Sequence, residues 1–362
     1  MIILQAFHWD CLKDWWGHLD SISKGIADKG FDTVWLPPPS KGMNGEGSMG
    51  YDVMEHYNLN SRFGDKESLT NLINSFHEED VGVMADLVMG HMLGGDLEYN
   101  PDTDCRTYTK FDEPKFPKNY KHFKPGDEDV SDFGETIDYY SDDEHMKDGL
   151  IQWASWLKED IGFDSFRLDN LKDMDLDFVN EFTNEFEDEF IVGEYWSGDT
   201  VKLQSIQSQV NIPTFNFPLF YKLKEMCMNP DYPIVNLTNC NSFSPCKKVN
   251  FVANHDIERG SRDINEDAIM SNKELAYAYI FFQDNPVVVF WNDYFRYDLK
   301  DKIDRLIKVR KDSKDAELQL IHVDNDIYHA KRGKYSLIIN NSKDSRSYRG
   351  LEIDPQSYII LD

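Results

Sequence analysis

The chain has 362 residues, which is enough for one large barrel with a small appended domain and a sizeable hydrophobic core. Acidic residues outnumber basic ones by 66 to 38, and the formal net charge is −28. This excess argues against nucleic acids and anionic membranes as partners, because both attract cationic surfaces.

Short apolar, β-prone segments alternate with helix-length amphipathic stretches along the first 312 residues. Eight strands separated by helical intervals are typical of a (β/α)₈ barrel. The predicted strands are residues 2–7, 31–36, 81–88, 163–168, 190–194, 213–217, 249–253 and 286–291.

Two parts of the chain interrupt or follow this pattern. Residues 92–145 are rich in Asp, Lys, Pro and Tyr, and a loop of that length usually forms a functional insertion. Residues 313–362 alternate β-prone runs with turn signals and predict a small antiparallel β domain. The expected domains are therefore a barrel at 1–91 and 146–312, an inserted domain at 92–145 and a C-terminal domain at 313–362.

Compartment and redox state are predicted from the N-terminus and the five cysteines. No basic segment with a long apolar stretch begins the chain, which favours a cytoplasmic protein, or a secreted one if a leader was removed. No run of about twenty apolar residues predicts a membrane helix. The cysteine spacing fits no zinc site and favours reduced thiols, with a Cys240–Cys246 bridge as the alternative in an exported protein.

Three acidic residues end apolar β-like runs: Asp169, Glu194 and Asp256. Any one of them alone is more often a solvated loop acid, since acids are abundant here. An unpaired buried charge is costly, however, so three such positions in succession predict carboxylates that converge at the C-terminal mouth of the barrel, where such folds carry out their chemistry. Aromatic residues make up 14% of the chain; they suit sugar-binding surfaces, although most serve as core.

Through the segments that carry these three acidic residues, the chain resembles the α-amylases, which are retaining glycosidases with a barrel, an inserted B domain and a C-terminal β domain. The similarity to plant and archaeal α-amylases is marked by WLPPPS at 35–40 and FPLFYKL at 217–223. The four segments that match the family signatures, in order, are DLVMGH at 86–91, GFDSFRLDNLKD at 162–173, GEYW at 193–196 and FVANHD at 251–256.

The resemblance implies catalytic roles for the three carboxylates. Asp169 matches the nucleophile, Glu194 the general acid/base, and Asp256 the carboxylate that holds the sugar hydroxyls. Arg167 lies two residues before Asp169 on the same strand, so both side chains point to the same face, where the cation would orient Asp169. The remaining positions that match substrate-binding residues are Tyr51, His91, Lys172, Trp196 and His255.

The resemblance also implies a structural calcium site, but one ligand is missing. The family usually has Asn where this chain has Gly90, which offers no side-chain oxygen. The other matching positions are Glu128, Asp138 and Asp173. Calcium takes six to eight oxygen ligands, so the sequence predicts weak or absent calcium binding. No organic cofactor is expected.

The expected function is hydrolysis of α-1,4-glucosidic bonds in starch, glycogen or maltodextrins by a retaining enzyme, acting as a monomer on a glucan partner. One alternative is an exo-acting α-glucosidase or transglycosylase on the same scaffold. Another, from a different class, is a non-catalytic glucan-binding relative; the three intact carboxylates argue against it, whereas the fold alone would not.

Overall fold

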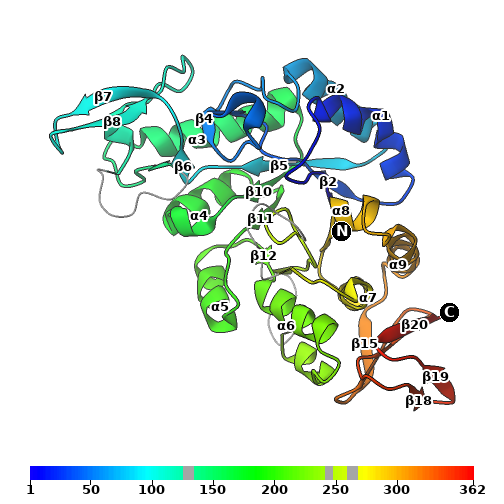
Figure 1. The fold of residues 1–362 in the computed structure, drawn as a ribbon. Helices are drawn as coiled ribbons and strands as arrows, with labels where there is room; N and C mark the ends of the chain where they lie inside the picture. Colours follow the sequence, from blue (N-terminus) through cyan, green and yellow to red (C-terminus); the bar gives the residue numbers. More distant parts are fainter. Residues whose placement is uncertain (125–133, 241–247, 259–267) are drawn as a thin grey trace.

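The computed structural model describes residues 1–124, 134–240, 248–258 and 268–362, without the side chains of 239 and 240. Eight parallel strands form its centre (Figure 1), in the order β13-β12-β11-β10-β5-β2-β1-β14. A parallel bridge between Asn250, just after β13, and Val287 in β14 closes the sheet into a barrel. The strands are β1 (Ile2–Gln5), β2 (Thr33–Trp35), β5 (Gly82–Leu87), β10 (Ser165–Leu168), β11 (Phe190–Gly193), β12 (Thr214–Phe215), β13 (Lys248–Val249) and β14 (Val287–Phe290).

All eight predicted strands are therefore confirmed, although the observed ones are shorter. Their side chains are mostly apolar and nearly all buried, as in β14, whose four residues are Val, Val, Val and Phe. β12 is only two residues long because Asn216 caps the next helix, accepting a hydrogen bond from the backbone N–H of Leu219.

Helices surround the barrel and alternate with its strands (Figure 1). They are amphipathic, as in α1, where Trp15, Trp16, Leu19 and Ile26 face the core. The helices are α1 (Trp15–Ala27), α2 (Lys66–His77), α3 (His145–Trp156), α4 (Leu176–Glu185), α5 (Thr200–Gln209), α6 (Phe217–Met228), α7 (Lys273–Phe282), α8 (Trp291–Phe295) and α9 (Lys300–Asp312), with short turns η1 (Gly45–Gly47), η2 (Tyr120–His122), η3 (Leu157–Ile161), η4 (Leu171–Asp173) and η5 (Ile234–Cys240).

A segment with small two-stranded sheets leaves the barrel after β5. β6 (His91–Met92) pairs with β9 (Glu135–Thr136), and β7 (Asp96–Asn100) pairs with β8 (Cys105–Lys110) in a hairpin that projects from the barrel (Figure 1). A third pair, β3 (Lys41–Gly42) with β4 (Val53–Glu55), belongs to the loop after β2. The predicted interruption of the barrel after its third strand is thus observed.

A buried ionic cluster fixes the inserted segment to the β4 loop. Lys118 Nζ donates to Glu113 Oε2 at 2.6 Å and to His56 Nδ1 at 3.3 Å, and Glu113 also accepts the backbone N–H groups of His56 and Tyr57. Burial would raise the pKa of Glu113, but the neighbouring His56 and the Lys118 cation lower it to about 2. The two charged groups, Lys118 and Glu113, are thus paired with each other, as a buried charge requires.

The C-terminal residues form a separate antiparallel sheet beside α7 and α9 (Figure 1). Its order is β15-β16-β17-β20, and β18 pairs with β19 next to it. The strands are β15 (Leu318–Val323), β16 (Ile327–Arg332), β17 (Tyr335–Asn340), β18 (Arg346–Tyr348), β19 (Leu351–Ile353) and β20 (Ser357–Leu361). The predicted C-terminal β domain is confirmed.

Two expectations from the sequence concern membrane helices and the cysteines. No helix in the described ranges is long and apolar enough to cross a membrane. Cys11, Cys105 and Cys227 are free thiols, while the alternative Cys240–Cys246 bridge lies outside the described residues.

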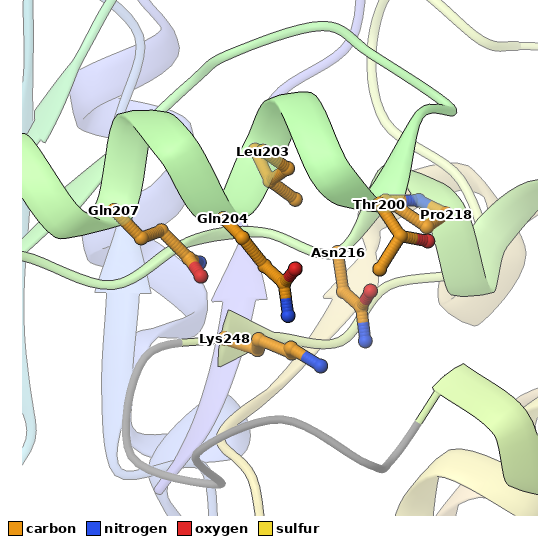
Figure 2. Close-up of a pocket in the computed structure, with 7 residues that line it drawn as sticks. All are labelled: Thr200, Leu203, Gln204, Gln207, Asn216, Pro218 and Lys248. Atoms are coloured by element: carbon orange, nitrogen blue, oxygen red, sulfur yellow. The ribbon is translucent and has the colours of Figure 1, made fainter.

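Between α5 and the ends of β12 and β13 there is a cavity of about 10 Å³, which has room for one water molecule (Figure 2). This cavity is too small for a sugar.

Candidate active site

The three predicted carboxylates follow barrel strands at the same end of the sheet. Asp169 comes directly after β10 and Glu194 directly after β11, and the backbone N–H groups of both continue the barrel hydrogen bonding, to Leu87 O and Leu168 O, at 3.0 Å each. Asp256 follows β13 after a turn in which Asn254 Oδ1 accepts the N–H groups of Asp256 and Ile257. The backbone thus holds all three at the C-terminal mouth of the barrel.

Arg167 joins two of these carboxylates to a third acid. Its guanidinium is fully buried; Nη1 donates to Asp169 Oδ1 at 2.6 Å and to Asp86 Oδ1 at 2.7 Å, while Nη2 lies 2.9 Å from Glu194 Oε1. The parallel register places Arg167 beside Asp86 on β5. The predicted orientation of Arg167 toward Asp169 is observed, and one cation fixes the positions of both carboxylates.

Asp86 is a site residue that the sequence reasoning missed. Its side chain is fully buried, and besides Arg167 it accepts hydrogen bonds from Trp35 Nε1 at 3.0 Å and Tyr51 Oη at 2.8 Å. Its position in the 86–91 signature segment was the available signal. Asp86 thereby ties the guanidinium to the aromatic side of the mouth.

The surroundings raise the pKa of two of the three carboxylates, Glu194 and Asp256. Burial raises the pKa of Glu194, the Arg167 cation opposes this, and the nearby Asp169 carboxylate raises it further. Burial and the neighbouring Glu194 also raise the pKa of Asp256 well above its usual range. Asp169 shares an ion pair of 2.6 Å with Arg167, in which Nη1 contacts Oδ1. An ionised and a protonated carboxyl side by side are the pair that acid-assisted nucleophilic displacement requires.

His255 connects Asp256 to the aromatic wall of the mouth. Its Nε2 lies 3.2 Å from Asp256 Oδ2, and its Nδ1 lies 2.8 Å from Gln5 Nε2. Burial and the Arg167 cation lower the pKa of His255 well below its usual range, so the ring is neutral. Because the contacting atom of Gln5 is the amide nitrogen Nε2, which can only donate, Nδ1 accepts, and the ring proton is on Nε2 of His255, directed at Asp256.

Aromatic rings line the barrel mouth on the side of His255. The Tyr51 ring stacks on His255 with centroids 5.0 Å apart and planes 7° from parallel, and Trp9 lies 5.5 Å from His255 and 5.8 Å from Tyr51. His91 Nε2 is 2.8 Å from the carbonyl oxygen of Tyr51. Trp9 and Gln5 were not predicted as site residues, although Gln5 lies in the predicted first strand, residues 2–7, and Trp9 follows it by two residues.

Two predicted substrate-binding residues lie next to this group and contact other side chains. The Lys172 ammonium is 5.6 Å from the centre of the Tyr195 ring. Trp196 donates from Nε1 to Tyr221 Oη at 2.9 Å and stacks on Phe217. Both follow the strands that carry Asp169 and Glu194, so their substrate-binding role stays a prediction.

The residues that matched the calcium ligands are dispersed or outside the described ranges. Glu128 falls in the segment that is not described. Asp138 accepts the backbone N–H of Tyr140, and Asp173 accepts from Asn170 Nδ2 at 2.8 Å. A Cβ atom at Gly90 would lie 2.8 Å from Asp173 Cβ, so the loop leaves no space for Asn at this position. Among the described residues, no three His, Cys, Asp or Glu side chains are grouped so that they could hold a metal ion.

The chain is similar to known proteins in both sequence and structure. The family model "Alpha amylase, catalytic domain" matches residues 5–317. The cytoplasmic alpha-amylase of Escherichia coli (strain K12) is 28% identical, covering 81% of this chain and 74% of the relative. The probable alpha-amylase 2 of Arabidopsis thaliana is 25% identical, covering 86% and 80%. The acarbose complex of the Geobacillus thermoleovorans alpha-amylase superposes with a TM-score of 0.78 at 18% identity, covering 99% of this chain and 97% of that one.

Proposed function

The chain belongs to the α-amylase family and is a glycoside hydrolase of the α-amylase type, and from that premise we propose that Asp169, Glu194 and Asp256 hydrolyse α-1,4-glucosidic bonds by double displacement. The observation that carries the proposal is the position of Arg167, whose Nη1 and Nη2 contact Asp169 and Glu194. Two carboxyl groups on one guanidinium are held close together, as in retaining enzymes, where they lie about 5 Å apart.

The first chemical step uses Asp169 and Glu194 together. An Asp169 oxygen attacks the anomeric carbon while Glu194 gives its proton to the glycosidic oxygen, so the carbon–oxygen bond breaks and the leaving sugar departs neutral. The raised pKa of Glu194 supports this acid role, because it keeps the carboxyl protonated closer to neutral pH. Arg167 supports the nucleophile role because its Nη1 holds Asp169 Oδ1 in place at 2.6 Å.

In the second step Glu194 acts as a base. It takes a proton from water, the resulting hydroxyl attacks the anomeric carbon, and Asp169 is released. We assign Asp256 and His255 to the sugar hydroxyls, with the neutral His255 Nε2–H and the Asp256 carboxyl side by side, 3.2 Å apart. Tyr51 and Trp9 supply half-buried ring surface at the same mouth, which suits a sugar ring.

The substrate proposal is an α-1,4-glucan such as starch, glycogen or a maltodextrin. It is tested with soluble starch and with a maltoheptaoside blocked at its non-reducing end. We expect cleavage inside the blocked chain and a rapid fall in starch chain length. Release of glucose from unblocked chains only would indicate an exo-acting α-glucosidase, and products longer than the substrate would indicate a transglycosylase.

The proposal also covers the compartment and the oligomeric state of the enzyme. We propose a cytoplasmic enzyme that acts as a monomer. The compartment is supported by the Escherichia coli relative, which carries the name cytoplasmic alpha-amylase.

We further propose that calcium binds this chain weakly or not at all. The support is the contact between Gly90 and Asp173, which fills the place of the missing amide ligand, together with the absence of a metal-binding group among the described side chains. Because a ligand that binds only the native state stabilises it by mass action, removing calcium should change Tm by no more than about 2 °C. Differential scanning calorimetry with EDTA and then excess calcium checks this; a larger fall that calcium restores would show that a site is completed by residues such as Glu128.

A further inference from the structure

A polar groove crosses the boundary between the barrel and the C-terminal sheet, away from the carboxylates. Its volume is about 380 Å³, which falls in the range of roughly 300–1,000 Å³ for small-molecule sites. One side is formed by α7 and α9 and the other by residues 356–358, at the start of β20. Ligand sites often lie at such domain boundaries.

The lining of the groove includes one aromatic ring, Tyr358, that the fold holds in place. Tyr358 is half-buried and packs against the main core, and its strand is paired with β17 through Ile339. The neighbouring Arg305 on α9 donates to the carbonyl oxygen of Ile360 in the same strand at 3.0 Å. A ring that the fold already holds loses little conformational freedom when a flat ligand face covers it.

The charges of the groove suit a neutral ligand. The lining holds two acids, Glu274 and Asp301, and two bases, Lys302 and Arg305, so its charges balance in number. Lys302 forms an ion pair of 2.7 Å with Glu274, and Arg305 Nη2 donates to the carbonyl oxygen of Ile360. The groove therefore does not favour an anion, whereas its carboxylate, hydroxyl and amide groups can exchange hydrogen bonds with a polyhydroxylated chain.

We propose that this groove is a second α-glucan site, which holds a sugar of the polymer on Tyr358 while the barrel mouth cleaves elsewhere. The ligand class rests on the proposed function, since an enzyme that cuts a polymer meets many sugar units at once. A second contact on the same polymer raises the effective concentration of the chain near the barrel mouth. Short substrates that contact only the barrel mouth do not bind more tightly because of the second site.

The test measures adsorption to starch granules in a Glu194→Gln background, so that the polymer is not consumed. Tyr358→Ala should weaken adsorption about fivefold to tenfold, in line with the loss of one aromatic stacking contact, while Tyr358→Phe should keep it. Asp301→Ala removes an exposed groove acid with little risk to the fold and should weaken adsorption by at least about twofold. Tyr108→Ala is the matched control, because this exposed ring lies on the β7–β8 hairpin.

The same substitutions are then made with Glu194 intact. Hydrolysis of a short aryl maltooligosaccharide should change less than twofold in Tyr358→Ala, whereas KM on granular starch should rise. Unchanged adsorption in the folded Tyr358→Ala and Asp301→Ala variants, an equal loss in Tyr108→Ala, or a parent that does not adsorb would each overturn the groove assignment. If the Glu194→Gln protein adsorbs but the protein with Glu194 intact cleaves neither substrate, the proposed function would be overturned instead.

Discussion

Glu194→Gln should lower kcat/KM on starch by about 10³-fold, and Asp169→Asn by about 10⁴-fold or more. Gln cannot give a proton to the glycosidic oxygen, and Asn cannot form the glycosyl-enzyme bond. Both amides still accept a hydrogen bond from Arg167, so the fold should persist. Steady-state assays at matched circular dichroism measure the effect.

A change of leaving group separates the two roles. An aryl maltoside with an acidic phenol leaves without protonation, so its first step does not need Glu194. The Glu194→Gln variant should therefore release a burst of phenol before the second step stalls. Asp169→Asn should show no burst with either substrate. Near wild-type starch hydrolysis in either folded variant would contradict the assignment.

Arg167→Met should have the largest effect on stability. The buried guanidinium contacts Asp86, Asp169 and Glu194, and its loss leaves a fully buried carboxylate at Asp86 without a counterion. Breaking such a buried pair typically costs about 3–5 kcal/mol of unfolding free energy. We expect this loss in urea denaturation, together with loss of activity because Asp169 and Glu194 are no longer oriented.

The pH dependence provides a control for this prediction. Burial raises the pKa of Asp86 to about 7 even with Arg167 present. A carboxyl whose folded pKa is raised contributes stability at low pH and loses it as the pH rises through the folded pKa. The deficit of Arg167→Met should therefore be smaller at pH 5 than at pH 8.

A second substitution tests the pairing itself. Asp86→Asn keeps an acceptor for Trp35 and Tyr51 but removes the charge. Adding it to Arg167→Met should recover about 1–2 kcal/mol, because the two positions are coupled. An Arg167→Met variant within about 1 kcal/mol of wild type at pH 8 would show that the guanidinium does not neutralise this cluster.

The barrel and the three carboxylates could be predicted because their signals are local. A strand buried on both faces must be apolar, and an acid at its end stands out against that background. The orientation of Arg167 toward Asp169 follows from the two-residue period of a strand. Family signatures supplied the order of the segments and hence the roles.

The remaining contacts depend on packing between distant segments. Gln5 and His255 are 250 positions apart, and Asp86 meets Arg167 only through the register of β5 against β10. The cluster of Glu113, Lys118 and His56 joins an insertion to a barrel loop, so no local pattern marks it. Lys172 and Trp196 could be placed near the mouth from sequence, but their present partners, Tyr195 and Tyr221, could not.

The configuration of the first-formed product tests the double displacement most directly. Attack by Asp169 inverts the anomeric carbon once, and attack by the water that Glu194 activates inverts it again. Proton NMR in the first minutes of maltooligosaccharide hydrolysis should therefore show the α-anomer of the new reducing end before mutarotation mixes the two forms. An initial β-anomer would mean a single displacement by water, and Asp169 could not be the nucleophile.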